Sequence, residues 1–231
     1  MKPKHTRITA EELLRQREGD PLYCAQMQNL AKQKAATSAK FMEAAAPLMA
    51  ELAATGYEVE SLEVIPQSRS HKDAVPILIK WLPKVASFPV KQSIIRALSV
   101  SWAGRDAVNA LLTEFHSTSG SSTVGLKWAI GNALEVLASD EFFDAYVKVA
   151  QEKHHGIARQ MVVSALGKMK NPKAVNVLLG LLGDEEVVGH ALIGLKKLKA
   201  KEARPQIEPL LNHSKAWIRK AAKETLARIE S

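Results

Sequence analysis

Apolar residues recur at helical spacing along most of the chain, and from residue 72 onward one pattern returns about every thirty residues. Its copies end in Arg96-Ala97-Leu98, Asn132-Ala133-Leu134, Ser164-Ala165-Leu166, Ile193-Gly194-Leu195 and Glu224-Thr225-Leu226. The last leucines of these copies are 36, 32, 29 and 31 residues apart, which is room for two short helices and their turns. The pattern predicts an all-α chain folded as an α-solenoid, in which helical pairs pack on their neighbours.

Each copy also contains an earlier apolar segment, which predicts the first helix of a pair. The five copies are expected to occupy approximately residues 72–101, 104–138, 140–169, 171–198 and 200–230. Pro76 and Pro205 fall in or near the first turn of first helices, where proline bends the chain. Residues 117–122 are serine- and glycine-rich, and we expect a surface loop that accounts for the longest spacing.

The region before the repeats is expected to be helical as well. Residues 1–8 are polar and basic and predict a flexible tail. Thr9 and Glu12 have the spacing of a capping box, so a short helix should follow. Asp20-Pro21 marks the start of another helix, with a break near Thr37-Ser38.

Residues 9–71 are interpreted as an N-terminal helical cap and connector for the array 72–231. A solenoid needs a cap because its end unit would otherwise expose an apolar face. Gly56 is expected to end the helix, since glycine readily adopts the left-handed conformation of a C-cap. The stretch from Tyr57 to Ser70 fits either a short strand or a helical turn, which Pro66 should end.

The second helices resemble HEAT repeats. The resemblance rests on two stretches, residues 157–167 (IARQMVVSALG) and 217–222 (WIRKAA), and on the turns with Asp or Asn that precede such helices. It is closest to the short HEAT-like repeats also found in phycobilin lyases, and it covers about two-thirds of the chain. The resemblance implies a fold rather than a function. HEAT proteins include transport receptors, phosphatase scaffolds, chromatin proteins, bilin lyases and alkylpurine DNA glycosylases.

In such arrays the second helices line the concave face. Counted back from the repeated leucine, position −7 holds Lys91, Lys127, Arg159, Val188 and Arg219, and position −6 holds Gln92, Trp128, Gln160, Gly189 and Lys220. We expect these positions to form a basic, polar ladder along one side of the array. The predicted partner-binding residues are Lys91, Lys127, Trp128, Arg159, Gln160, Arg219 and Lys220.

Two interpretations of this ladder are open. The basic residues could pair with acidic residues or carbonyls of the neighbouring unit, or they could receive phosphates or carboxylates of a partner. Trp128 could stack on a base, anchor a peptide or pack under the serine-rich loop. Val188-Gly189-His190 interrupts the ladder with small residues and predicts a notch, where His190 would bond across a junction between units.

The distribution of charge adds a second indication. The formal net charge is +8, residues 1–71 are neutral overall, and residues 190–231 carry ten Lys or Arg against four Asp or Glu. A localised positive field attracts nucleic acid, acidic proteins or anionic surfaces. The alternative is that the charge serves solubility and the stability of helix C-termini.

The sequence disfavours several kinds of site and several classes of protein. Cys24 is the single cysteine, so no internal disulfide or cysteine-based zinc site is expected. The start lacks an apolar signal segment and no apolar run is long enough to span a membrane, so the cytoplasm is the expected location. We recognise no catalytic motif, cofactor fingerprint or metal signature, and the adjacent pair His154-His155 points two ways.

Three functions follow, in order of preference. The first is a non-enzymatic, monomeric scaffold or adaptor that grips an acidic or amphipathic protein segment on its concave face. The alternative is a nucleic-acid binder that contacts phosphates without base specificity. The third is a lyase- or glycosylase-like enzyme with a pocket near Gly189 and His190. Basic residues engaged between repeats would favour the first, a continuous positive groove the second, and an apolar cavity the third.

Overall fold

The computed structural model describes residues 9–120 and 124–230, and within these ranges the chain is all-α, with no strand. The expected tail, residues 1–8, lies outside the described residues. The chain separates into two compact units, Met1–Pro47 and Leu48–Ser231. The segment that we expected to act as one cap and connector is thus divided between the two units.

The first unit holds α1 (Ala10–Glu18) and most of α2 (Pro21–Ala54). The capping box is confirmed, because the Glu12 amide donates to Thr9 Oγ1 at 3.2 Å and the Thr9 amide donates to Glu12 Oε2 at 2.9 Å. Asp20 caps α2 as expected and accepts a hydrogen bond from the Leu22 amide at 2.8 Å.

The predicted break within α2 is wrong, since the helix continues through Thr37 and Ser38. The Thr37 hydroxyl donates to the Gln33 carbonyl one turn earlier, at 2.8 Å. A threonine that bonds back in this way is compatible with an unbroken helix. The helix ends near Gly56, which has a φ of +87°.

The connector is helical rather than extended. It consists of two 3-10 helices, η1 (Leu62–Gln67) and η2 (Arg69–Ala74). Pro66 lies inside η1, so the expectation that it ends the segment is wrong. Leu62 and Ile65 are buried, and they fix this connector against the helices that follow.

Two helices fall within each of the five ranges that carry the repeated pattern. The first helices are α3 (Val75–Trp81), α5 (Gly104–Ser117), α7 (Phe143–Gln151), α9 (Ala174–Gly180) and α11 (Arg204–Ile207). The second helices are α4 (Phe88–Leu98), α6 (Val124–Val136), α8 (Gln160–Leu166), α10 (Val188–Leu198) and α12 (Ala216–Glu230). Short 3-10 helices lie between them, namely η4 (Asp140–Phe142), η5 (Lys153–Arg159), η6 (Lys201–Ala203) and η7 (Glu208–Asn212). We number these helical pairs 1 to 5 in chain order.

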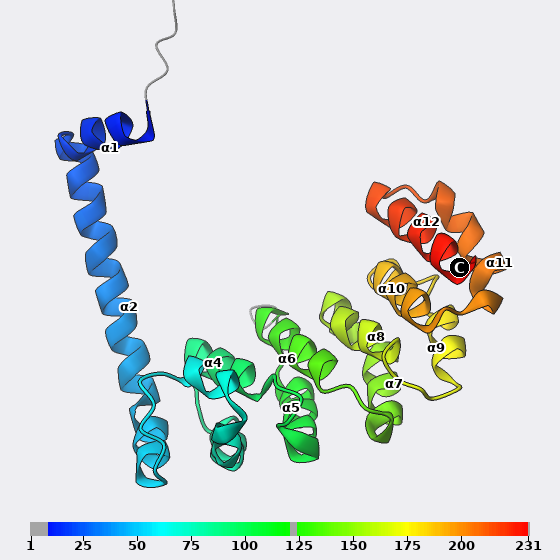
Figure 1. Ribbon diagram of the computed structural model, residues 1–231, viewed down its shortest axis with the longest axis horizontal. Coiled ribbons are helices and arrows are strands. Elements are labelled where there is room, and N and C mark those ends of the chain that lie inside the picture. The colour runs from blue at the N-terminus through cyan, green and yellow to red at the C-terminus, as the bar shows by residue number, and fades with distance from the viewer. Residues whose placement is uncertain (1–8, 121–123, 231) are drawn as a thin grey trace, which may run out of the picture. The chain divides into compact units, whose positions relative to one another are not determined.

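The second helices pack on one another in chain order, α4 on α6, α6 on α8, α8 on α10 and α10 on α12. Figure 1 shows these five helices side by side in one row, with α5, α7, α9 and α11 along the other side of it. The repeated leucines of pairs 1 to 4 are completely buried, whereas Leu226 of the last helix is only partly covered. The pattern that we read as a repeat is therefore the pattern of a shared core.

One contact between α8 and α10 depends on glycine. A Cβ atom added at Gly167 would overlap the backbone of Gly194. Because a backbone cannot move aside as a side chain can, only glycine fits at Gly167. The helices of pairs 3 and 4 approach to backbone contact here.

Candidate functional site

The basic residues at position −7 of pairs 1 to 3 turn toward the next pair along the chain. Lys91 at the start of α4 reaches Glu114 near the end of α5, with Nζ 2.5 Å from Oε1. Both side chains are shielded, with exposed fractions of 16% and 7%. If this ion pair were broken, each charge would be left shielded from water and without its counter-ion. The ion pair therefore holds α5 to α4.

Lys127 of α6 makes the equivalent contact with pair 3. Its Nζ lies 3.0 Å from Nδ1 of His155 in η5 and 5.1 Å from the centre of the Phe115 ring. Burial lowers the pKa of Lys127, against the attraction of Glu152. Burial, together with Lys127 and His154, lowers the pKa of His155 to about 4, so this imidazole is neutral at neutral pH. An ammonium can only donate, so the neutral ring accepts at Nδ1.

Arg159, the last residue of η5, makes the most extensive junction. Its side chain has no exposed surface, and its Nε and Nη1 donate to the carbonyls of Gly156 and Ala150 at 3.0 and 2.9 Å. Nη2 donates to Oε2 of Glu186 at 2.8 Å, and Nη1 lies 2.9 Å from Oδ2 of Asp184. Burial of Asp184 would raise its pKa, but Arg159, the Glu186 amide and Lys153 together hold that pKa below its ordinary value.

Of the two interpretations of the ladder, the contacts of these three residues therefore match the pairing of neighbouring units. Arg159 presents no donor on the surface, which corrects the expectation that its guanidinium lines an open face. Lys91 and Lys127 are mostly covered as well. The positively charged groups at position −7 of pairs 1 to 3 therefore join neighbouring pairs and are not free cations.

The remaining ladder residues are more open. Gln160 is partly buried and donates through Nε2 to the Glu186 carbonyl at 2.8 Å. Arg219 is exposed, and its Nη1 donates to the carbonyls of His213 and Ser214 in the turn before α12. The Lys220 side chain is 79% exposed, with its Nζ 3.9 Å from Oε1 of Glu224.

The notch expected at Gly189 is filled. The indole of Trp217 from α12 occupies the space that a side chain at Gly189 would need. Trp217 nevertheless remains 49% exposed. An aromatic ring of pair 5 thus replaces the cation that joins the earlier pairs.

His190 is only partly covered, but its Nδ1 atom is buried and has no hydrogen-bond partner among the described residues. The expected bond across the junction is therefore absent at this atom. Burial lowers the pKa of His190, assisted by Lys197 and opposed by Glu135.

The face of the second helices also carries a polar network that the sequence reasoning missed. Lys197 of α10 donates to Oε1 of Glu135 and to Oγ of Ser164, at 3.0 and 3.1 Å, and so spans pairs 2 to 4. Lys168 joins it, 3.4 Å from the same carboxylate. Burial would raise the pKa of Glu135, but these lysines hold it below its ordinary value.

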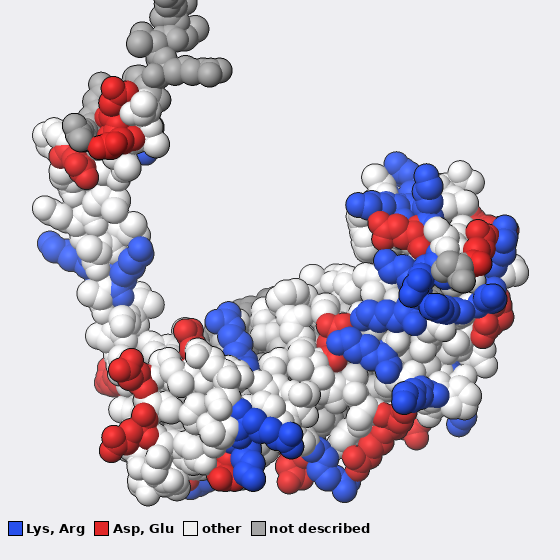
Figure 2. Space-filling model, viewed as in Figure 1, with Lys and Arg blue, Asp and Glu red and all other residues white. Residues whose placement is uncertain are grey.

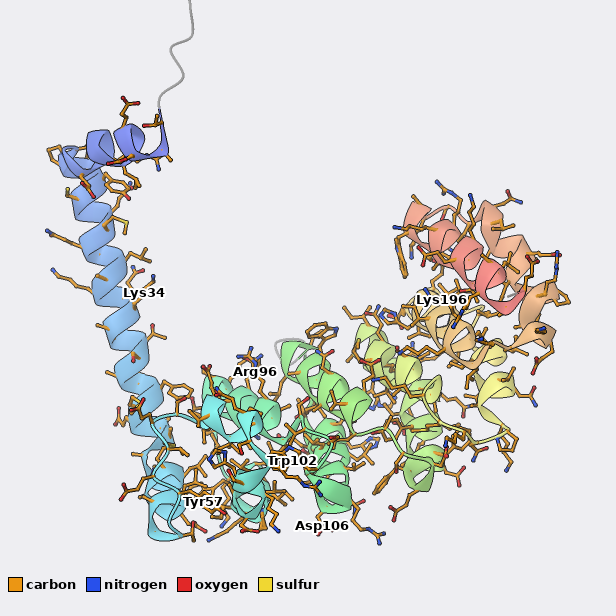
Figure 3. The ribbon with its side chains drawn as sticks, in the orientation of Figure 1. Lys34, Tyr57, Arg96, Trp102, Asp106 and Lys196 are labelled. Atoms are coloured by element: carbon orange, nitrogen blue, oxygen red, sulfur yellow. The ribbon has the colours of Figure 1, made fainter. Side chains whose placement is uncertain are left out.

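A basic hollow lies at the C-terminal end of this face. It has a volume of about 630 Å³ and is lined by Lys196, Lys197, Glu224, Ala227 and Arg228. Lys and Arg gather over α10 and α12 in Figure 2, and Lys196 lies between these two helices in Figure 3. The positive balance of residues 190–231 was the signal for this surface, but it did not identify the residues.

Exposed apolar side chains mark the other end of the second helices. They lie within the first five residues of a second helix or just before it, and they are Phe88, Val124, Trp128, Ile157 and Trp217. Trp128 alone was singled out in the sequence, and it is 48% exposed. A hollow of about 530 Å³ opens beside the first of these residues, lined in part by Phe88, Lys91 and Leu126.

Three side chains could hold a metal ion, His116, Glu152 and His155. Their ligand atoms lie within 4.8 Å of one another. The sequence separates His116 from the other two by a whole helical pair, so adjacent histidines alone could not reveal the group.

Among the helices that the structure describes, none has both the length and the apolar content needed to cross a membrane. No protein-family model matches the sequence, and no curated protein is significantly similar to it. The arrangement of the residues is thus the basis for a functional proposal.

Proposed function

We propose that residues 72–231 form an α-solenoid of HEAT-like repeats that binds a protein segment carrying both apolar and acidic side chains. The observation that carries this proposal is the engagement of Lys91, Lys127 and Arg159 in contacts between pairs. A ladder of free cations would suit a phosphate backbone. Because these cations are engaged within the protein, the exposed apolar side chains near the starts of the second helices become the main feature of this surface.

The ordered packing of the second helices supports the solenoid. Each of these helices contacts the next one, and the repeated leucines of the first four pairs are buried at the same position. Arrays in which each unit contacts its neighbours present extended faces to their partners. In this proposal the row of second helices is the concave, partner-binding face.

The apolar residues at the helix starts would anchor the partner. Trp128 and Ile157 come from elements in direct contact, α6 and η5, and both are about half exposed. A half-exposed indole offers a large apolar area at a low cost in conformational entropy, and tryptophan is enriched among residues that dominate binding energy. Aliphatic neighbours such as Ile157 and Val124 favour apolar side chains over nucleobases, which prefer to stack on rings.

The basic hollow would receive carboxylates of the same partner. Lys196, Lys197 and Arg228 surround it, with Glu224 as the acidic residue in its lining. Lys196 Nζ already lies 3.0 Å from Oε2 of Glu224. A partner carboxylate would therefore share this lysine with Glu224. Such contacts set specificity and association rate more than affinity.

Nucleic acid is the second candidate, and the basic hollow on α10 and α12 favours it. In that case phosphates would occupy the hollow, and binding would fall steeply with salt. The protein proposal requires Trp128, whereas a phosphate-only contact does not.

Selection from a displayed library of helical peptides, followed by fluorescence anisotropy of the enriched sequences, tests the proposal. We expect enriched peptides to combine apolar residues at helical spacing with Asp or Glu. Trp128→Ala should weaken binding about tenfold or more, the effect of removing a dominant anchor. Lys197→Glu should weaken the same peptides.

Val136→Ala is the matched control, since Val136 is an exposed apolar residue at the opposite end of α6. Equal losses for Trp128→Ala and Val136→Ala would contradict the assigned face. Binding of DNA or RNA at physiological salt, unaffected by Trp128→Ala but lost with Lys197→Glu, would favour the second candidate.

A further inference from the structure

A group of metal-binding side chains lies where pair 2 meets pair 3, and none of them lines the basic hollow. His116 stands in the last turn of α5, Glu152 directly follows α7, and His155 lies in η5. Nε2 of His155 is 3.1 Å from Oε2 of Glu152, and Nδ1 of His116 is 3.5 Å from the same oxygen.

These separations match those of ligands around one small cation. A tetrahedral zinc ion binds nitrogen and oxygen at about 2.0–2.1 Å, which places neighbouring ligand atoms roughly 3.3 Å apart. The two measured distances, 3.1 and 3.5 Å, lie on either side of this value. Since all three ligand atoms lie within 4.8 Å, small side-chain rotations would bring the third pair into range.

The surroundings hold the buried ligand in place and leave the site accessible. The His155 side chain is 3% exposed, and its ring meets the edge of Phe115 with centroids 4.8 Å apart. His116 and Glu152 are partly open to solvent. A preformed, rigid ligand beside two accessible ones leaves a fourth position for water, as in sites with three protein ligands.

Lys127 acts against a bound cation. Its Nζ lies 3.0 Å from Nδ1 of His155, on the side of the ring opposite to Glu152. Metal at Nε2 requires the ring proton on Nδ1, and a metal-bound histidine normally donates that proton to a carbonyl or carboxylate. An ammonium cannot accept it, so Lys127 must turn away from Nδ1 when a cation binds at Nε2.

We propose that His116, Glu152 and His155 form a binding site for a divalent cation of the zinc class, which ties pair 2 to pair 3, and that Lys127 limits its affinity. Two imidazoles and one carboxylate select zinc or a neighbouring transition metal over magnesium and calcium, which prefer oxygen ligands. The cation would stabilise a junction of the array, a role independent of the binding of a protein segment.

Isothermal titration of the full chain with zinc chloride, after treatment with a chelator, tests the site. We expect one zinc per chain, no uptake of magnesium, and an affinity lowered about tenfold or more by His116→Ala or by Glu152→Gln, since the loss of a partner that only orients a ligand already costs that much. Both residues are partly exposed, so these variants should fold, and circular dichroism checks that they do.

His213→Ala is the matched control, because His213 also contacts a glutamate, Glu185, but lies in pair 5. It should leave the affinity unchanged. Uptake that is absent, or that is equally reduced in all three variants, would overturn the proposal.

Lys127→Gln sharpens the test, since an amide oxygen can accept the Nδ1 proton of metal-bound His155. We expect this variant to bind zinc more tightly than the wild type and to give the visible absorption of tetrahedral cobalt when cobalt replaces zinc. Weaker binding by Lys127→Gln would overturn the role assigned to Lys127.

Discussion

The junction between pairs 3 and 4 and the junction between pairs 4 and 5 occupy equivalent places in the repeat, yet they are built differently. The first centres on Arg159, which is fully buried and contacts Asp184 and Glu186. The second has Val188 at the same position, and Trp217 packs on the neighbouring Gly189 instead. A cation and its partners in one junction are thus replaced by a ring on a glycine in the next.

The difference shows that a repeated basic residue has no fixed role in this chain. Where the next pair supplies buried acceptors, as for Lys91 with Glu114, the cation becomes part of the interior. Arg219 of α12, by contrast, stays at the surface and donates to the carbonyls of its own turn. Whether a basic residue at position −7 becomes buried is decided by the partner in the following pair, not by the basic residue itself.

The largest expected effect comes from breaking the charged junction. Arg159→Met should lower the free energy of unfolding by about 3–5 kcal/mol, because it leaves the mostly buried carboxylate of Asp184 without its cation. Denaturant unfolding measures this loss. Lys220→Met, at an exposed site, should change the same quantity by no more than about 0.5 kcal/mol.

A side chain placed at Gly189 tests the apolar junction between pairs 4 and 5. Gly189→Ala should lower the free energy of unfolding by about 1–3 kcal/mol, the usual cost of overpacking, because its methyl group would overlap the Trp217 ring. Trp217→Ala in the same chain should recover part of that loss. If Gly189→Ala alone is neutral in thermal unfolding, the ring does not pack on this glycine.

Acid should lower the stability of the fold through His190 of α10. Burial lowers the pKa of His190 in the folded protein, so the unfolded chain binds more protons below the ordinary histidine pKa near 6.5. The free energy of unfolding should therefore fall as pH drops below about 6.5. His190→Met, which introduces the residue found at the matching position of pair 3, should flatten this part of the pH profile. An unchanged slope would contradict the burial of this imidazole.

The smallest effect on stability is expected at Arg219, which is exposed near the start of α12. Arg219→Met should change the free energy of unfolding by no more than about 0.5 kcal/mol, since the side chain is exposed and loses two bonds within its own turn. The comparison with Arg159→Met is direct because both residues occupy position −7. A loss as large as that of Arg159→Met would erase the distinction between the two junctions.

The helical pairs could be predicted from the sequence because the repeated leucine marks a buried position whatever the exact packing. The break at Thr37 was a wrong prediction, because a side chain that bonds one turn back does not interrupt a helix. The short turns η1 and η2 were not predicted as such, since few residues and one proline leave strand and helix equally open.

The role of the basic ladder could not be predicted from its own positions, since these show only that the residues share one side of the helices. A usable signal lay further along the chain. Acidic partners of Lys91 and Arg159 follow after 23 and 27 residues, which is close to one repeat. Val188 has no charge to pair. Gly189 beside it is covered by Trp217, which follows later in the chain.

The most direct test of the account is a double-mutant cycle between Arg159 and Asp184, in which unfolding free energies are measured for Arg159→Met, Asp184→Asn and the double variant. Asparagine keeps the oxygen that accepts the Glu186 amide and removes only the charge. We expect the two residues to be coupled by about 1–3 kcal/mol, as residues in one buried network are. Losses that add to within about 0.3 kcal/mol would contradict the claim that a buried cation joins these repeats.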